Sequence, residues 1–122
     1  MQLAKLTKLV VATLEDLKAL DLKVLDVRSM TTVTDTMIIV SGTSTRHVKA
    51  MADSVAQKTS TAGHRPLGIE GGQEGEWVLV DLGDVVVHIM LPQTRDFYNL
   101  EKLWDKDLVL AAEKRAAKTK SQ

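Results

Sequence analysis

Two runs of strand-forming residues flank the dipeptide Gly83-Asp84, and this arrangement restricts the fold more than any other part of the chain. A Gly-Asp pair between such runs is a strong signal for a two-residue β-hairpin. The turn predicts a register in which Asp81 faces Val86 and Leu79 faces His88. Side chains alternate between the faces of a strand, so a slip of one residue would exchange all of these partners.

The predicted hairpin has one aliphatic face and one mixed face. The aliphatic face consists of Val78, Val80, Leu82, Val85, Val87 and Ile89. The mixed face consists of Trp77, Leu79, Asp81, Val86, His88 and Met90. A buried core needs only aliphatic side chains, so the acid, the imidazole and the indole of the mixed face indicate a further role.

The chain of 122 residues is long enough for one domain with a real core, and its 44% of hydrophobic residues is typical of globular proteins. No apolar run is long enough to cross a membrane. The N-terminal segment carries charges throughout, unlike a signal peptide. Cysteine is absent, which excludes disulfides and thiolate metal sites. We therefore expect a cytoplasmic protein.

Sixteen basic and sixteen acidic residues balance. Nucleic-acid binding by charge alone depends on clustered Lys and Arg, so this balance does not favour it. The C-terminal AAEKRAAKTKSQ is locally basic. A solvated, fraying helix end explains this segment, and a weak contact with RNA or with an acidic partner is the alternative.

Hydrophobic periodicity predicts helices and strands in the order α-β-β-α-β-β-β-α. The segments are a helix over 3–20, strands over 22–28 and 36–40, a helix over 45–62 capped by Ser44 and closed by Gly63, an extended segment over 65–69, the hairpin over 77–90, a helix from about 95, and a helical continuation over 105–118. Pro92 ends the last strand and Thr94 caps the following helix in this prediction. The fold class is α/β (α+β), with a mixed five-stranded sheet and flanking helices.

The segment Ser41-Gly42-Thr43-Ser44 joins a predicted strand to a predicted helix, and it is a candidate phosphate or anion site. Helix N-termini present free N–H groups, and Gly42 would let a ligand approach closely. Arg46 and His47 lie in the first turn of the helix and would assist. The pattern matches neither of the established Gly-rich phosphate motifs, so an ordinary strand-to-helix turn remains the alternative.

Acidic residues flank the hairpin turn. Asp81 and Asp84, with Asp26 and Asp35, are candidate ligands for Mg²⁺, although no Asp-x-Asp pair projects from one strand face. Asp84 is also explained as a turn residue. His88 and Asp81 would form a hydrogen-bonded acid–base pair, and a satisfied, partly buried imidazole is the alternative. The histidines lack the spacing of metal ligands.

The helix predicted from about residue 95 has two distinct faces. One face holds Arg95, Tyr98 and Glu101, and another holds Phe97, Leu100 and Trp104. We predict Phe97, Leu100 and Leu103 in the core. Tyr98 and Trp104 are candidate interface anchors, because Tyr and Trp are enriched at protein interfaces. The alternative is that these rings cap a core that is short of other large residues.

Many of these segments resemble the ribosomal silencing factor (RsfS) family, also called Iojap-related. The matching residues are Leu25-Asp26-Val27, Thr34-Asp35, Ser41 to Ser44 with Arg46-His47-Val48, Glu70-Gly71, Trp77, Asp81 to Asp84, Val87-His88, Arg95 and Phe97 to Trp104. They are collinear over about residues 5–105. Many relatives have an aromatic pair where this chain has Thr36-Met37. We predict a family domain over 1–107 and a basic, helical, fraying extension over 108–122.

The resemblance implies a fold similar to nucleotidyltransferases, without known catalysis, cofactor or metal. It implies binding to the large ribosomal subunit through its protein L-fourteen, near ribosomal RNA, so that the small subunit cannot join. It further implies a homodimer when free, with no membrane partner and no small-molecule substrate. The alternatives are a divergent nucleotidyltransferase-like nucleotide-binding protein and a pure dimerisation module. We predict that the partner is contacted by Trp77, Asp81, Asp84, His88, Arg95, Tyr98, Glu101 and Trp104.

Overall fold

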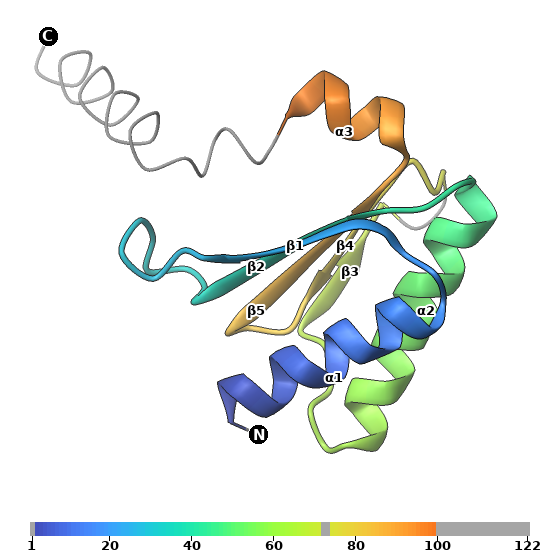
Figure 1. Ribbon diagram of the computed structural model, residues 1–122. Helices are drawn as coiled ribbons and strands as arrows, with labels where there is room; N and C mark the ends of the chain where they lie inside the picture. The colour runs from blue at the N-terminus through green and yellow to red at the C-terminus, as the bar shows by residue number, and fades with distance from the viewer. Residues whose placement is uncertain (1, 72–73, 100–122) are drawn as a thin grey trace, which may run out of the picture.

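The computed structural model describes residues 2–71 and 74–99 (Figure 1). The elements in chain order are α1 (Leu3–Asp16), β1 (Leu20–Asp26), β2 (Thr36–Ser41), α2 (Thr45–Thr61), β3 (Gly68–Glu70), β4 (Trp77–Asp81), β5 (Val85–Met90) and α3 (Pro92–Tyr98). The predicted order α-β-β-α-β-β-β-α is confirmed. None of the helices described by the structure is both long and apolar enough to span a membrane.

The five strands form one mixed sheet in the order β1-β2-β5-β4-β3. Strands β2 and β5 are parallel, and the other neighbouring pairs are antiparallel. All six residues of β2 are buried, as expected for a central strand that is covered on both faces. The α/β class with a mixed five-stranded sheet is therefore confirmed, while the likeness to nucleotidyltransferases stays a prediction.

The β4–β5 hairpin has the predicted register. Leu79 pairs with His88, and Asp81 pairs with Val86. Gly83 occupies the first position of the two-residue turn with a φ of +86°, a conformation that glycine adopts without steric cost. The alternation predicted for the two strands therefore places the aliphatic and the mixed side chains on opposite faces of the sheet.

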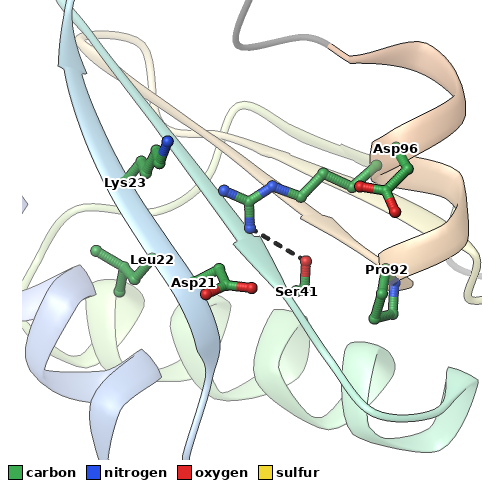
Figure 2. A pocket seen from close by; sticks show the side chains of 7 residues that line it. Asp21, Leu22, Lys23, Ser41, Pro92 and Asp96 are labelled. Atoms are coloured by element: carbon green, nitrogen blue, oxygen red, sulfur yellow. Dashed lines mark hydrogen bonds between the residues drawn. The ribbon is translucent and has the colours of Figure 1, made fainter.

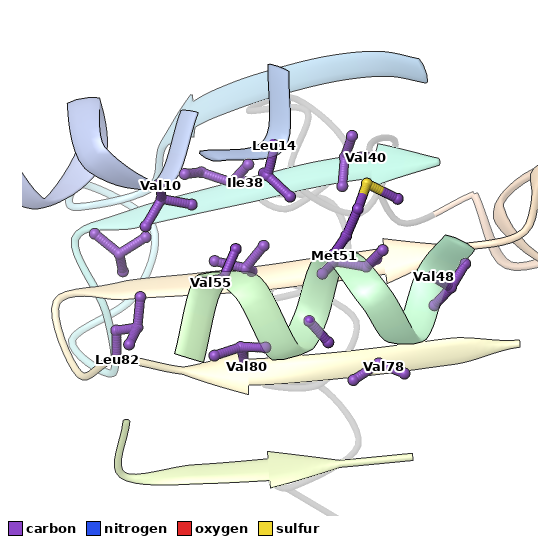
Figure 3. Close-up of a cluster of buried hydrophobic side chains, with 14 of the residues drawn as sticks. Val10, Leu14, Ile38, Val40, Val48, Met51, Val55, Val78, Val80 and Leu82 are labelled. Atoms are coloured by element: carbon purple, nitrogen blue, oxygen red, sulfur yellow. The ribbon is translucent and has the colours of Figure 1, made fainter. Parts of the chain in front are cut away.

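Helices α1 and α2 cover the aliphatic face (Figure 3). Val10 and Leu14 of α1 and Met51 of α2 are fully buried against the strands. The six hairpin residues predicted for this face all belong to the main core: Val78, Val80, Leu82, Val85, Val87 and Ile89. This packing occupies one face of the sheet, so any partner must use the other face, an edge or the helices.

The opposite face of the sheet has a smaller core of Val27, Met37, Ile39 and Met90, with Trp77 packed against it. Helix α3 reaches this face, because its Arg95 contacts Ser41 and its Tyr98 contacts Trp77. Figure 1 shows α3 on the side of the sheet away from α1 and α2. The mixed face is therefore covered in part by a short helix.

Several predicted boundaries differ from the structure. Helix α1 ends at Asp16 rather than at residue 20, because Lys18 adopts a left-handed φ of 60°, and β1 begins at Leu20, earlier than predicted. Helix α3 begins at Pro92 rather than near residue 95. Proline suits the first position of a helix, where its missing N–H is not needed.

Two predictions for α3 are wrong. Thr94 does not cap the helix, since it lies inside α3 and Leu91 occupies the N-cap position. Phe97 is not in the core, because its side chain is 81% exposed. The helix ends at Tyr98, with Asn99 in the left-handed conformation, and it turns Arg95 rather than Phe97 toward the sheet. The predictions for Leu100, Leu103, the 107/108 boundary and the helix over 105–118 lie outside the described residues.

Candidate functional site

Trp77 is the centre of an aromatic cluster on the mixed face. Its Nε1–H donates a hydrogen bond of 2.9 Å to Nδ1 of His88. The ring centroids of Trp77 and Tyr98 are 4.9 Å apart, and Phe97 meets Tyr98 edge-on at 5.0 Å. These four side chains come from β4, β5 and α3, so the fold brings together rings that are up to 21 positions apart in sequence.

The strand register explains how this cluster forms. Trp77 pairs with Met90, and Leu79 pairs with His88, so Trp77 and His88 are diagonal neighbours on one face. Diagonal pairs in antiparallel strands are within reach of long aromatic side chains. Helix α3 then begins two residues after β5 and carries Tyr98 back to the Trp77 ring.

His88 is held as a neutral imidazole. Its side chain is only 7% exposed, and burial lowers the pKa of His88 from its ordinary 6.5 to about 4. Nδ1 accepts the indole hydrogen bond, so the proton of the neutral ring is on Nε2. His88 therefore orients Trp77 and carries no charge at neutral pH.

The predicted acid–base pair between His88 and Asp81 is wrong. Oδ1 of Asp81 accepts a hydrogen bond of 2.9 Å from the backbone N–H of Gly83, which stabilises the hairpin turn. The partner of the imidazole is Trp77 instead. The alternative, a satisfied and partly buried imidazole, is confirmed as to the hydrogen bond, and the side chain is more deeply buried than predicted.

The exposed part of the cluster forms a surface that we call the aromatic patch, consisting of Trp77, Phe97 and Tyr98. Phe97 is 81% exposed and Tyr98 is 52% exposed, whereas Trp77 is partly buried. Large exposed rings that lie together on a surface are typical of interaction sites. On the same sheet face, partly exposed Leu79, Asp81 and Val86 extend from the patch toward the hairpin turn.

The structure does not bring all of the predicted partner-binding residues together. Asp81 lies four positions along β4 from Trp77, about 13 Å at the usual strand rise. Asp84 is exposed in the hairpin turn, beyond Asp81. Glu101 and Trp104 lie outside the described residues. The aromatic rings thus occupy one end of the hairpin, and the two acids occupy the other.

Arg95 and Ser41 were assigned by sequence to two different sites, but they are bonded to each other. An Nη1–H of Arg95 donates a hydrogen bond of 3.1 Å to Oγ of Ser41, and the arginine is only 7% exposed. A pocket of about 470 Å³ lies beside this bond, lined by Asp21, Leu22, Lys23, Ser41, Pro92, Arg95 and Asp96 (Figure 2). Periodicity in the sequence gave no signal for this contact between β2 and α3.

The start of α2 has the predicted cap. Oγ of Ser44 accepts a hydrogen bond of 3.1 Å from the backbone N–H of His47. Nδ1 of His47 accepts a hydrogen bond of 2.9 Å from the N–H of Thr43. On the other side of the ring, Nε2 donates a hydrogen bond of 2.7 Å to the carbonyl of Leu17. His47 therefore ties the N-terminus of α2 to the end of α1.

Gly42 is explained by packing within the protein. A Cβ at this position would lie 2.9 Å from both Met51 Cε and Val48 Cγ2. Arg46 is exposed beside this turn. The hydrogen bonds of the turn and the close approach of α2 account for the SGTS segment without an anion, so a phosphate site here stays a prediction.

The four acids considered as magnesium ligands do not converge. No group of three His, Asp or Glu side chains within 2–71 and 74–99 is placed to hold a metal ion. Asp26 instead pairs with Arg28 at 2.7 Å, and this hydrogen bond lowers the pKa of Asp26. Asp35 joins the hairpin turn through its backbone N–H, which donates to the carbonyl of Asp84.

The fold and the aromatic patch define a mixed α/β domain with the features of a macromolecule-binding module. The model of the family described as "Ribosomal silencing factor during starvation" (RsfS) matches residues 1–122, and the chain belongs to this family.

Known relatives agree with this assignment. The ribosomal silencing factor RsfS of Chromobacterium violaceum is 48% identical over 104 residues, covering 85% of each chain. A crystal structure from the same organism has a TM-score of 0.84 at 48% identity and covers 85% of this chain and 87% of its own. A more distant mouse relative, "Mitochondrial assembly of ribosomal large subunit protein 1", is 39% identical over 99 residues, covering 79% of this chain and 43% of that one.

Proposed function

We propose that this ribosomal silencing factor binds the large ribosomal subunit through its protein L-fourteen and thereby blocks joining of the small subunit. The family supports a role on the ribosome. The name of the mouse relative connects that protein with the large subunit. The protein acts in the cytoplasm, turns over no substrate, and exists as a homodimer when free, with ribosomal RNA close to its bound position.

The aromatic patch is the observation that carries this proposal. Among the residues that the structure describes, Tyr98 and Phe97 are two of the most exposed large hydrophobic side chains. Tyr98 packs against Trp77, and Phe97 packs against Tyr98. Tyr and Trp frequently dominate binding energy when a partner buries them. Helices α1 and α2 pack on the other face of the sheet and do not cover the aromatic patch.

The patch is held in place before binding. The hydrogen bond to His88 fixes the indole of Trp77, and the ring of Tyr98 packs against the indole at 4.9 Å. A surface that is already ordered loses less conformational entropy on binding. Asp81 and Asp84, at the other end of the hairpin, would attract basic groups of the partner and accelerate association.

The direct test is binding of variants to purified large subunits. Trp77→Ala and Tyr98→Ala should each reduce the binding free energy, measured by co-sedimentation, by about 2 kcal/mol or more, as expected for interface anchors. Leu67→Ala is the matched control, because Leu67 is 76% exposed and lies beside Gly83, at the far end of β4 from Trp77. Normal binding by both aromatic variants, in protein that remains folded, would reject this surface.

A second assay separates binding from silencing. Adding the protein to separated subunits should reduce the formation of joined ribosomes. Adding the Tyr98→Ala variant instead should leave the formation of joined ribosomes close to its level without the protein. Purified protein L-fourteen should compete for the factor in the same assay. If the factor sediments with joined ribosomes as well as with free large subunits, steric blocking is wrong even though binding is retained.

A further inference from the structure

Helix α3 carries two rings of the aromatic patch, yet it has almost no apolar anchor in the core. Arg95 is the only buried residue of its seven. Phe97 and Tyr98, its two aromatic residues, are both exposed. The position of the helix on the sheet therefore depends on contacts other than hydrophobic burial.

Two contacts hold α3, and they lie at opposite ends of a line of paired residues that runs across β2, β5 and β4. Ser41 on β2 is in register with Met90 on β5, and Met90 is in register with Trp77 on β4. Arg95 binds Ser41 at one end of this line, and Tyr98 packs on Trp77 at the other end. Residues three apart lie on one face of a helix, so the two contacts together fix the orientation of α3.

We propose that Arg95 is a positioning residue, which sets α3 through Ser41 so that Tyr98 packs on Trp77 and Phe97 projects toward the partner. This inference rests on the proposed docking surface and assigns Arg95 a role other than the direct partner contact predicted from sequence. A side chain that is 7% exposed offers little surface to a rigid partner.

The chemistry of arginine suits this role. Its guanidinium stays charged at all physiological pH values and presents five N–H donors in a rigid plane. Arg95 has other interactions besides the bond to Ser41, so loss of the hydroxyl should loosen α3 without freeing it. The pocket of about 470 Å³ beside the guanidinium gives the side chain and the helix room to shift.

The first measurement is binding of Ser41→Ala to large subunits. If loss of the hydroxyl leaves α3 correctly placed in about a tenth of the molecules, the apparent Kd rises about ten-fold. Ser41→Thr keeps the hydroxyl and should bind more tightly than Ser41→Ala. Gln93→Ala, an exposed position on the same helix, is the control and should bind normally.

The second measurement follows the patch in the free protein. The NMR signal of the Trp77 indole N–H, assigned by its loss in Trp77→Phe, reports the nearby Tyr98 ring. Ser41→Ala and Arg95→Lys should move this signal toward its position in Tyr98→Ala, whereas Gln93→Ala should not. An unchanged signal in both of the first two variants would overturn the positioning role.

A double-mutant cycle distinguishes positioning from direct contact. If Ser41 and Arg95 act through Tyr98, then Ser41→Ala should weaken binding much less in a Tyr98→Ala background than alone. Additive losses of binding would show that the contact between Ser41 and Arg95 does not act through the Tyr98 ring, and would overturn the inference. Normal binding by Tyr98→Ala and Trp77→Ala instead rejects the docking surface itself, while the indole signal still tests the placement of α3.

Discussion

The indole N–H of Trp77 donates a 2.9 Å hydrogen bond to Nδ1 of His88, and this bond exists only while the imidazole is neutral. A protonated imidazole carries hydrogen on both nitrogens and accepts nothing. Burial favours the neutral form, since it lowers the pKa of His88 to about 4. The orientation of the patch and the protonation state of a buried histidine are therefore linked.

This linkage predicts a loss of stability in mild acid. Between the ordinary pKa of 6.5 and the folded value of about 4, the unfolded chain binds a proton at His88 and the folded chain does not. The free energy of unfolding therefore falls as the pH drops through this window, by up to about 3 kcal/mol from this residue. Urea unfolding at a series of pH values from 7 to 4 measures the effect.

The control is His88→Asn, whose amide oxygen can accept the bond from Trp77 but does not titrate. All other ionisable groups are common to both proteins, so the difference between their pH profiles isolates His88. We expect a shallower profile for His88→Asn between pH 6.5 and 4. Parallel profiles would show that the folded His88 titrates at its ordinary pKa.

Gly42 should tolerate no side chain. The added Cβ of Gly42→Ala would lie 2.9 Å from Met51 and Val48, both fully buried, so the start of α2 must shift. Overpacking of this kind costs about 1–3 kcal/mol. Gly68→Ala is the control, because its Cβ would meet nothing within 4 Å. Equal urea midpoints for the two variants would contradict the tight packing of Gly42 on α2.

The hairpin was predictable in detail from the sequence. The two-residue turn at Gly83-Asp84 defines one register for the two strands, and that register is observed. The alternation of side chains along each strand placed Trp77 and His88 on one face. It gave no sign of their hydrogen bond, because strand periodicity fixes the face of a side chain but not its partner.

Helix α3 was less predictable, for a physical reason. Its seven residues are too few for periodicity to define a buried face, and the buried side chain is the charged Arg95 rather than Phe97. Sequence reasoning expects buried residues to be apolar, since a buried charge must be paired. The hydrogen bond from Arg95 to Ser41, 54 positions away, arises only from the tertiary fold.

His47 should matter for stability rather than for binding anions. His47→Ala removes acceptor and donor contacts to Thr43 and Leu17 and leaves those backbone groups to find other partners. We expect a loss of about 1–3 kcal/mol in the free energy of unfolding. Arg46→Ala, at the exposed neighbouring position, should change the free energy of unfolding by no more than about 0.5 kcal/mol. A similar loss in both variants would mean that His47 does not bridge the helices.

Phe97 provides the sharpest separation of stability from binding. Because its side chain is 81% exposed, Phe97→Ala should change the free energy of unfolding by no more than about 0.5 kcal/mol. If the partner buries the ring, the same variant should lose about 2 kcal/mol of binding, a roughly 30-fold rise in Kd for large subunits.

The comparison with Leu67→Ala determines whether this loss is specific to the patch. Leu67 is also a large exposed apolar residue, 76% exposed, but it lies beside Gly83 rather than beside Tyr98. If the partner binds the aromatic patch, Phe97→Ala should weaken binding and Leu67→Ala should not. If binding is nonspecific hydrophobic adhesion, both variants should weaken it equally. If Phe97→Ala instead unfolds at a clearly lower urea concentration than Leu67→Ala, the ring is buried in solution. The placement of α3 on which the docking surface depends would then be wrong.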